Sequence, residues 1–214
     1  MKNKKYLWIV LVIIIIILLL YFFTGKKVEY SEMNNSRPHL GNPESSVVIH
    51  EYSDFQCPAC QSSQIVVEAI MNEYSDQIKL EFYNLPLTSI HKYAYKAAEA
   101  AACANDQNKF WEYHDMLYSH QEDLTMSDLE SYAETIGLDV ELWNDCLTTR
   151  TKKYVIEKDL SEALNLGLNS TPTFFLNGQR VESWGDLPSL VEALVKPVTA
   201  LDNDQVVATS TAEE

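Results

Sequence analysis

The sequence predicts a mixed α/β domain that is interrupted by a block of helices and preceded by one transmembrane helix. Two runs typical of strands, residues 46–52 and 78–83, flank a helical pattern over residues 58–74. Strand signals are then absent from residues 89–166 and return only near the end of the domain. An unbroken apolar run at residues 6–23 precedes all of these segments.

The first half of the α/β pattern is strand, helix, strand. Residues 46–52 (SVVIHEY) contain a short β-branched run that is typical of a buried strand. Residues 78–83 (IKLEFY) alternate between apolar and polar side chains, which predicts a second strand. In residues 58–74, apolar side chains recur at helical spacing, namely Ile65, Val66, Ala69, Ile70 and Tyr74.

The middle of the chain predicts helices only. Residues 89–166 contain KAAEAAACA, FWEYHDMLYSH, MSDLESYAETIG and VELWNDCL, and with the segment that follows they predict four or five helices. Gly137 and Gly167 are placed to end two of them. The aromatic side chains of this block recur at helical spacing, so we expect them in the core rather than in a binding site.

The second half of the pattern is a hairpin followed by a helix. Strand character returns at Thr173–Leu176. The dipeptide Asn177-Gly178, followed by Gln179–Glu182, predicts a tight β-hairpin, because both central residues of such a turn have positive φ. A final helix is expected at Leu187–Val195.

The apolar run at residues 6–23 has the length of a membrane-spanning helix. As a helix its 18 residues would extend about 27 Å, close to the thickness of the hydrocarbon core. Aromatic side chains lie near both ends, where the bilayer interface favours them. The alternative is a cleaved signal peptide, but the run is long for a signal core and no A-x-A-like site follows it. We therefore expect a retained anchor that contacts the lipid bilayer.

Charge divides the chain into two parts. The formal net charge is −15, but residues 1–27 hold five lysines and no acidic residue, which leaves −20 for the rest. Three lysines precede the apolar run and two follow it, a weak bias that places the acidic domain outside the cytoplasm. A domain this acidic has no basic face to neutralise phosphates, so the composition argues strongly against nucleic-acid binding.

The motif Cys57-Pro58-Ala59-Cys60 lies where a predicted strand ends and a helix begins. Unpaired N–H groups and the dipole at a helix N-terminus favour the thiolate of the first cysteine. Pro58 is tolerated in the first helical turn, where its missing N–H has no helical partner. Cys60, one turn further, can face the first sulfur and resolve a mixed disulfide. The motif therefore indicates a redox-active pair.

A metal site and a purely structural disulfide are the alternatives for this pair. One CxxC supplies only two ligands, and the five histidines and the other two cysteines are scattered along the chain. A disulfide that closes so short a loop removes little conformational entropy from the unfolded state. We therefore expect neither a metal nor any other bound cofactor.

These segments together resemble the DsbA-like thiol:disulfide oxidoreductases, which have a thioredoxin fold with an inserted helical domain. The resemblance covers about residues 41–197 and rests on five segments: YSDFQCPAC (52–60), LPLTSIHKYAYKAAEAAACA (85–104), KFWEYHDMLYSHQ (109–121), IGLDVELWNDCL (136–147) and STPTFFLNGQRV (170–181). Together with the apolar run and the polar composition of both ends, it predicts six parts of the chain: an anchor with lysine flanks at 1–27, a tether at 28–43, the first half of the thioredoxin fold at 44–87, a helical insertion at 88–166, the second half at 167–196, and a disordered acidic tail at 197–214.

The resemblance also implies roles for single residues. Cys57 matches the exposed nucleophile of the family and Cys60 its buried partner. Glu51 matches a buried carboxylate that relays protons to the buried sulfur, and burial raises the pKa of such a carboxyl toward neutrality. The alternative is that Glu51 is a core acid without a role in the chemistry.

Four further residues are implied to contact the substrate. Thr171-Pro172 resembles the cis-proline loop that faces the CxxC, in which the residue before the proline pairs with substrate in strand fashion. An ordinary trans turn proline is the alternative. The dipeptide Pro58-Ala59 between the two cysteines lacks the histidine of the strongly oxidising CPHC members. We therefore expect a less extreme redox potential for this dithiol.

Cys103 and Cys146 lie 43 residues apart in the predicted helical block. Outside the cytoplasm, a disulfide between them would contribute roughly 3–4 kcal/mol by the loop-entropy relation. Some members of the family that the chain resembles have such a second pair. Two unpaired core thiols are the alternative.

These features predict a single-pass protein of the cell membrane whose catalytic domain lies on the extracytoplasmic side. We expect an oxidase that donates the Cys57–Cys60 disulfide to exported polypeptides with cysteine pairs. The resemblance implies that a quinone-linked membrane partner of the DsbB or vitamin-K-epoxide-reductase type reoxidises it. A reductase or isomerase of the same fold and a non-redox binding module for unfolded chains are the alternatives.

Overall fold

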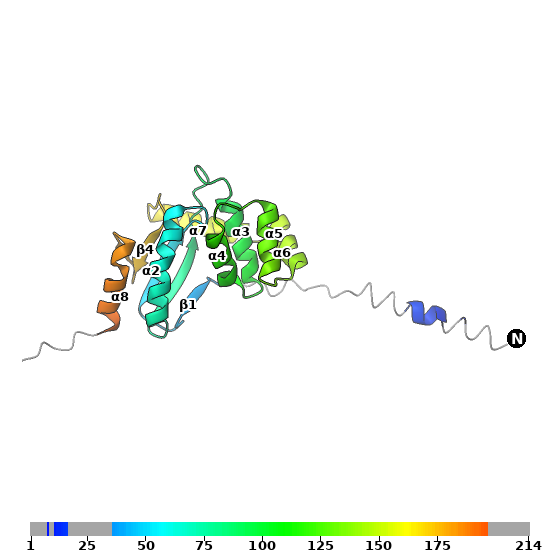
Figure 1. The fold of residues 1–214 in the computed structure, drawn as a ribbon, viewed down its shortest axis with the longest axis horizontal. Coiled ribbons are helices and arrows are strands. Elements are labelled where there is room, and N and C mark those ends of the chain that lie inside the picture. Colours follow the sequence, from blue (N-terminus) through cyan, green and yellow to red (C-terminus); the bar gives the residue numbers. More distant parts are fainter. Residues whose placement is uncertain (1–7, 9–10, 17–35, 197–214) are drawn as a thin grey trace, which may run out of the picture. The chain divides into compact units, whose positions relative to one another are not determined.

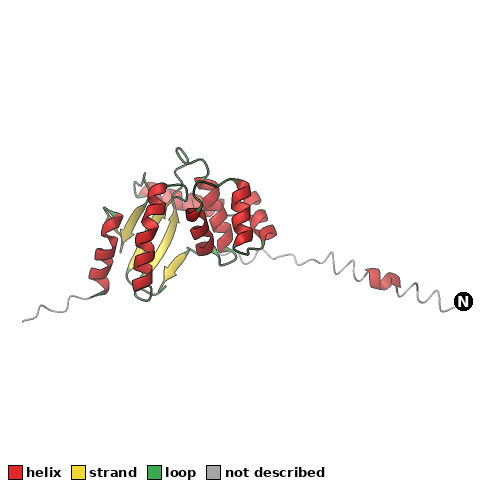
Figure 2. Ribbon diagram, in the orientation of Figure 1, coloured by secondary structure: helices red, strands yellow, loops and turns green. Residues whose placement is uncertain are grey.

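The fold is built on a mixed five-stranded sheet. The computed structural model describes Trp8, residues 11–16 and residues 36–196. Parallel pairing joins the strands β2 (Val48–Ser53) and β3 (Lys79–Asn84), whereas the other neighbours are antiparallel (Figures 1 and 2). The strand order across the sheet is β1 (His39–Gly41), β3 (Lys79–Asn84), β2 (Val48–Ser53), β4 (Thr173–Leu176) and β5 (Gln179–Val181).

The helices follow the order that the sequence predicts. One helix joins β2 to β3, five form a block between β3 and β4, and one ends the domain after a short 3-10 turn. The predicted order of strand–helix–strand, helical block and hairpin–helix is therefore confirmed. The elements are α2 (Pro58–Tyr74), then α3 (Ala94–Asn105), α4 (Phe110–Ser119), α5 (Met126–Thr135), α6 (Val140–Thr149) and α7 (Lys153–Asn165), and finally η2 (Trp184–Asp186) and α8 (Leu187–Val195).

The two faces of the sheet are covered by different helices. On one face, Ile49 of β2 shares a buried cluster with Val67 of α2 and Val191 of α8. On the other face, the Tyr52 hydroxyl donates a hydrogen bond to Glu162 Oε1 of α7 at 3.0 Å. Because side chains alternate along a strand, every second residue of β2 after Ile49 lies on the α2 side of the sheet.

The helical block has a core of its own that continues into the sheet. Small alanine side chains cover the buried surface of α3 and allow its neighbours to approach closely. Trp143 of α6 is fully buried, and its indole N–H donates to the carbonyl oxygen of Ala100 at 3.0 Å. The same cluster includes Phe55, which precedes α2, and Phe82 of β3. The block therefore shares one apolar core with the centre of the sheet.

A disulfide joins Cys103 of α3 to Cys146 of α6. Their Cα atoms are 5.9 Å apart, within the ordinary range for such a bond. Of the two states that the sequence leaves open, the structure contains the bonded one. The bond closes a loop that includes α4 and α5, and so ties the first helix of the block to the fourth.

Strand β1 is not predicted by the sequence, which placed its residues in the tether at 28–43. Three residues are too few to show a period, so only pairing with β3 defines this strand. Gly41 ends it at φ +82°, and a Cβ atom there would collide with the carbonyl oxygen of Ile78. The next strand, expected at residues 46–52, is observed at Val48–Ser53.

The hairpin turn between β4 and β5 has the geometry that the sequence predicts. Asn177 has φ 48° and Gly178 has φ 78°, as a tight turn of two residues with positive φ requires. The side-chain oxygen of Asn177 also accepts a hydrogen bond from the N–H of Val48 at 2.8 Å. The turn is thereby joined to the start of β2.

Most of the predicted membrane anchor lies outside the described residues, as do most of the tether and the whole tail at 197–214. Residues 11–16 are helical. Among the residues that the structure describes, no helix has both the length and the apolar character needed to cross a bilayer. The anchor at residues 6–23 stays a prediction.

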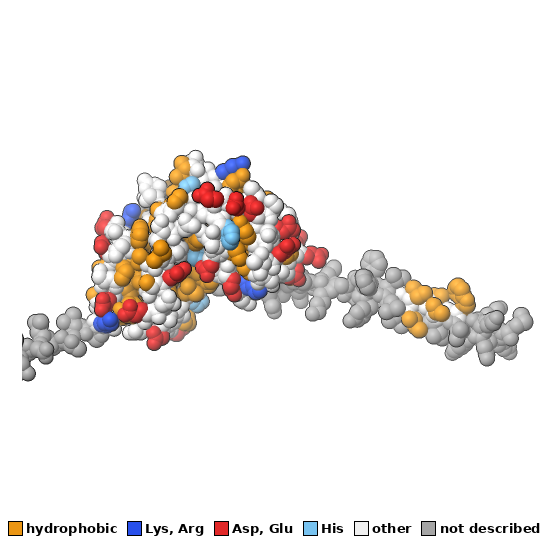
Figure 3. Space-filling view, in the orientation of Figure 1, with side chains coloured by type: hydrophobic (Ala, Val, Ile, Leu, Met, Phe, Trp, Pro, Cys, Tyr) orange, Lys and Arg blue, Asp and Glu red, His pale blue; other side chains and the backbone are white. Residues whose placement is uncertain are grey.

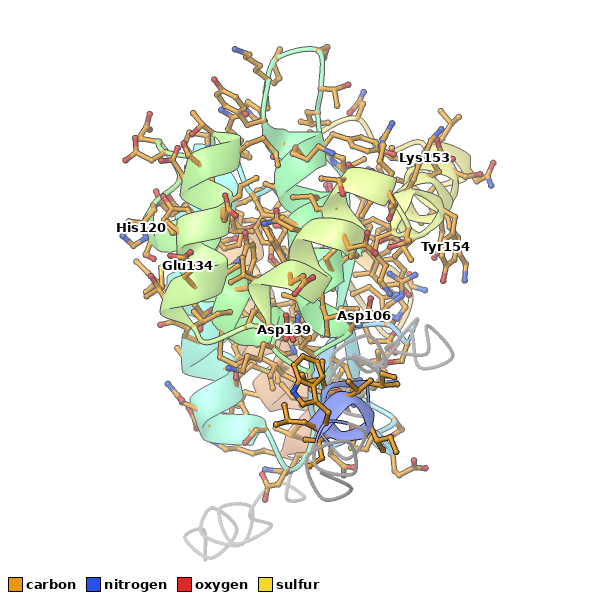
Figure 4. All side chains as sticks on the ribbon, turned by 90° about the vertical axis from the view of Figure 1, so that its right-hand side faces the viewer. Asp106, His120, Glu134, Asp139, Lys153 and Tyr154 are labelled. Atoms are coloured by element: carbon orange, nitrogen blue, oxygen red, sulfur yellow. A yellow bond between two sulfur atoms is a disulfide. The ribbon has the colours of Figure 1, made fainter. Side chains whose placement is uncertain are left out.

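Acidic side chains are spread over the surface of the domain. Figure 3 shows Asp and Glu scattered across the visible face, with fewer Lys and Arg among them. Figure 4 looks onto the helical block, where the exposed residues Glu134 and Asp139 lie toward the viewer. This distribution fits the strong negative charge of the chain after its lysine-rich start.

Removing the disulfide of the helical block should lower the stability of the domain. We expect the double variant Cys103→Ala/Cys146→Ala to lose about 3–4 kcal/mol of unfolding free energy, because the unfolded chain gains the freedom of an open loop. Urea denaturation, compared with the wild type, measures the difference. Wild-type protein in which the Cys103–Cys146 disulfide is reduced should lose a similar amount, and a loss below about 1 kcal/mol in both proteins would contradict the prediction.

Candidate active site

Cys57 occupies the position just before α2. Its backbone is extended, with φ −87° and ψ 118°, and Pro58 follows in the first helical turn. The backbone N–H of Cys57 donates to the carbonyl oxygen of Asp54 at 3.0 Å, which closes the turn between β2 and α2. The thiol itself contacts the carbonyl oxygen of Thr171 at 3.5 Å. This geometry directs the sulfur toward the N–H groups of the first helical turn.

The environment of Cys57 favours its thiolate. A hydrogen bond from the Cys60 thiol is the largest cause, and with the backbone N–H groups of Cys60 and Ala59 it lowers the pKa of Cys57 from 9.0 to about 5. Burial opposes this shift but does not cancel it. Cys57 is therefore a thiolate at neutral pH, the form that attacks disulfides.

Cys60 has the opposite character. Its side chain is fully buried, and burial raises its pKa far above the ordinary value for a thiol. Both cysteines are free, so the structure represents the dithiol form. Cys57 is only 7% exposed, so the structure buries the residue that was expected as the exposed nucleophile, although less completely than Cys60. The pair therefore combines a nearly buried thiolate with a protonated thiol that donates the hydrogen bond stabilising this thiolate.

Glu51 lies on the central strand β2, on the side of the sheet that α2 covers. It is completely buried, and its Oε1 atom accepts a hydrogen bond from Gln64 Nε2 of α2 at 2.8 Å. Its Oε2 atom has no hydrogen-bond partner among the described residues. Burial raises the pKa of Glu51, and the nearby His114 and the Gln64 hydrogen bond oppose only part of this rise.

Three polar residues that the sequence analysis missed connect Glu51 to the dithiol. The Ser53 hydroxyl lies close to the side chains of both Glu51 and Cys60, and its oxygen accepts a hydrogen bond from the Tyr118 hydroxyl at 3.0 Å. Gln64 also donates to the carbonyl oxygen of Cys60 at 3.3 Å. The result is a continuous polar network inside an apolar core.

Two of these residues have a signal in the sequence. Ser53 follows Glu51 by two positions on a strand and so shares its face, and Gln64 follows Cys60 by one helical turn. Tyr118 has no such signal, because it is 65 residues away from Ser53 in the chain.

The Thr171-Pro172 loop lies beside the dithiol. Its peptide bond is cis, the form the resemblance implied rather than the trans alternative. The contact between Cys57 and the carbonyl oxygen of Thr171 brings together residues 114 positions apart. Pro58 and Ala59 are exposed next to Cys57. Thr171, Pro58 and Ala59 therefore lie beside Cys57, with Pro172 next to Thr171 in the chain, and the contact of these four residues with substrate stays a prediction.

Other features of the described residues lie outside this constellation. No group of three or more His, Cys, Asp or Glu side chains in residues 36–196 is arranged to hold a metal ion. A cavity of about 280 Å³ lies where α3, α7 and residues 36–38 meet, lined by Arg37, Asn84, Lys152 and Asp159 among others. None of the predicted site residues lines it.

The dithiol at a helix N-terminus and the loop opposite it define a thioredoxin-type site. The family model described as thioredoxin matches residues 33–195, and the chain belongs to this family. The solved structures it resembles include a thioredoxin-like oxidoreductase from Silicibacter pomeroyi, with a TM-score of 0.67 and 25% identity over 78% of this chain and 96% of that one. They also include the thiol-disulfide exchange protein alpha-DsbA2 from Wolbachia pipientis, with a TM-score of 0.65 and 22% identity over 78% and 92% of the two chains.

The curated relatives are much longer proteins. Over 145 residues, the chain is 40% identical to the Na(+)/H(+) antiporter NhaA 1 of Salinispora arenicola. These residues make up 67% of this chain but only 22% of the antiporter, so the chain spans about a fifth of that relative's length.

The thiolate of Cys57 can be titrated directly. As the pH is raised, we expect the thiolate absorbance of the reduced protein to increase with a midpoint near pH 5, because the pKa of Cys57 is lowered to about 5. The unfolding free energy of the reduced form should then increase as the pH is raised from about 5 to 9.0, the ordinary pKa of the thiol. This stabilisation should be lost as the pH is lowered through about 5. Cys57→Ser, as control, should abolish the transition near pH 5, and a midpoint close to 9.0 in the wild type would refute the assignment.

Proposed function

We propose that this protein is a membrane-anchored thiol:disulfide oxidase that acts outside the cytoplasm. The observation that carries the proposal is the division of the dithiol into the Cys57 thiolate and the buried Cys60 thiol, with the carbonyl oxygen of Thr171 beside the reactive sulfur. The printed names of two structural neighbours, a thioredoxin-like oxidoreductase and a thiol-disulfide exchange protein, support the same reaction class.

The proposed reaction proceeds in two exchanges. A substrate thiolate attacks the Cys57 sulfur of the Cys57–Cys60 disulfide, a substrate–Cys57 bond forms, and Cys60 leaves as a thiolate that takes up a proton. A second substrate thiolate then attacks the substrate sulfur of this mixed disulfide. The substrate disulfide forms and Cys57 leaves as a thiolate. Two electrons pass from the substrate dithiol to the protein disulfide.

Glu51 is proposed to carry the proton to and from Cys60. The Ser53 hydroxyl lies close to both the carboxyl group of Glu51 and the Cys60 sulfur, and the raised pKa of Glu51 lets it hold a proton at higher pH than an exposed carboxyl. The Cys60 sulfur is fully buried and so depends on such a route.

The proposed direction of electron flow is supported by the stability of the reduced form. A lowered pKa of Cys57 stabilises the dithiol state at neutral pH, and a protein whose reduced form is stabilised tends to oxidise others. This favours oxidation of exported polypeptides with cysteine pairs. Reoxidation is proposed to come from a quinone-linked membrane partner of the DsbB or vitamin-K-epoxide-reductase type.

The proposed location rests on two features. The apolar run at residues 6–23 is long enough to span a bilayer. The disulfide between Cys103 and Cys146 is of a kind that persists in oxidising compartments and is rare in the cytosol.

Trapping the mixed disulfide tests the exchange mechanism. In Cys60→Ala the Cys57 thiolate can still attack a disulfide of an exported protein, the reverse of the second exchange, and a substrate thiolate leaves. Because Cys60 is missing and cannot release the adduct, we expect exported proteins to accumulate as disulfide-linked adducts on Cys57, visible as reducible bands on non-reducing gels. The double variant Cys57→Ala/Cys60→Ala is the matched control and should form none. Absence of adducts in a folded Cys60→Ala protein would contradict the mechanism.

The redox potential of the dithiol tests the direction. We expect equilibration with glutathione buffers to give a potential well above the value of about −270 mV known for thioredoxin. A potential as low as thioredoxin's would show a reductase instead.

A further inference from the structure

Cys60 must carry negative charge at the moment it leaves the disulfide, although its sulfur is fully buried. The N–H groups at the start of α2 serve Cys57, one turn away. A different backbone donor reaches Cys60: the N–H of Asp54 lies 3.4 Å from its sulfur. Asp54 follows directly after Ser53, the last residue of β2, so its N–H is turned toward α2 instead of a neighbouring strand.

The side chain of Asp54 holds this residue in place. Its carboxylate is completely buried. Oδ1 accepts a hydrogen bond from the N–H of Gln56 at 2.7 Å, and Oδ2 accepts one from the N–H of Leu87 at 2.8 Å. Oδ2 also pairs with Nδ1 of His91 at 2.7 Å. Together these bonds immobilise the residue whose N–H points at Cys60.

These partners come from two separate segments. Gln56 belongs to the turn that leads into α2, whereas Leu87 and His91 belong to residues 85–93, the connection between β3 and α3 (Figure 1). A second bond joins the same segments, because the N–H of Tyr93 donates to Gln56 Oε1 at 2.7 Å. The connection 85–93 therefore fixes the turn from outside.

We propose that Asp54 is a positioning residue: its carboxylate, anchored on residues 85–93, fixes its own backbone N–H against the Cys60 sulfur so that Cys60 can leave as a thiolate. The inference deepens the proposed thiol–disulfide exchange and rests on it. Asp54 touches neither the substrate nor the breaking bond through its side chain, and acts only through the N–H that it orients.

Charge and orientation predict opposite effects when Asp54 is replaced. Loss of a negative charge near Cys60 would favour the Cys60 thiolate and speed its departure. Loss of a correctly directed N–H would slow it, because a hydrogen bond to a charged acceptor is stronger than one to a neutral acceptor. A faster reaction of the variant would therefore indicate the charge effect, and a slower one would indicate the orientation effect.

The test is reduction of the oxidised full chain, in mild detergent, by dithiothreitol. The reagent's thiolate attacks Cys57, Cys60 leaves, and closure of the reagent's own disulfide releases Cys57, so two electrons enter the protein. We expect Asp54→Ala to react about tenfold more slowly than the wild type. Asp54→Asn should lie between them, since its amide oxygen still accepts from Gln56 while its NH₂ group faces the N–H of Leu87.

Two controls keep the result specific. Asp76→Asn, at an exposed position, should react like the wild type. Alkylation of Cys57 in reduced Asp54→Ala should stay within about twofold of the wild type, because the helix N-terminus is unchanged. An Asp54→Ala rate equal to or faster than wild type would overturn the inference. An equal loss of Cys57 alkylation would also overturn it, because the whole turn would then have collapsed.

The proposed function is tested separately in the same preparation. Dithiothreitol reduces the Cys57–Cys60 disulfide whatever the natural substrate is. The effect of Asp54→Ala on the rate of this reduction is therefore measured independently of the natural substrate. Oxidation of a peptide with two cysteines by the wild type reads the function. Failure with the peptide alone would refute the oxidase, whereas unchanged reduction of Asp54→Ala alone would refute the role of Asp54.

Discussion

The hydrogen bond from the Cys60 thiol to the Cys57 sulfur requires the two cysteines to have unlike surroundings. Cys60 can donate only while it is protonated, and burial keeps it so. Cys57 can accept as a thiolate because the first turn of α2 adds further donors. The sheet, α2 and the helical block all contribute to this contrast, since they exclude water from Cys60 while leaving Pro58 and Ala59 exposed beside Cys57.

Because Cys60 is buried in an apolar core, its sulfur and backbone depend on polar groups of the protein. Three residues on different elements supply such groups. The Ser53 hydroxyl of the central strand lies close to the sulfur, and Asp54 supplies a backbone N–H from the turn that follows. Gln64, one helical turn after Cys60, connects the helix backbone to Glu51. A group left without partners there would cost stability, so the network and the dithiol depend on each other.

Much of the fold was predictable because its signals are local. The helix at Pro58–Tyr74 and the strand at Thr173–Leu176 were expected with the bounds that the structure shows, since periodicity and turn residues mark them. Strand β1 was not predictable, because three residues carry no period. The same holds for the site. The CxxC is recognisable from its spacing and from its position between a strand and a helix. Tyr118 and the partners of Asp54 on residues 85–93 are distant in the chain and come together only in the tertiary fold.

The shared core of the helical block and the sheet has a consequence for how this architecture can be altered. Phe55 and Phe82 pack in the same cluster as Leu129 and Trp143 of the insertion. A shortened chain in which β3 was joined directly to β4 would expose these aromatic rings and the apolar side chains that pack around Cys60. The insertion therefore cannot be exchanged as an independent module: transplanting a foreign helical block would require matching its inner surface to the strand–helix half that holds the dithiol.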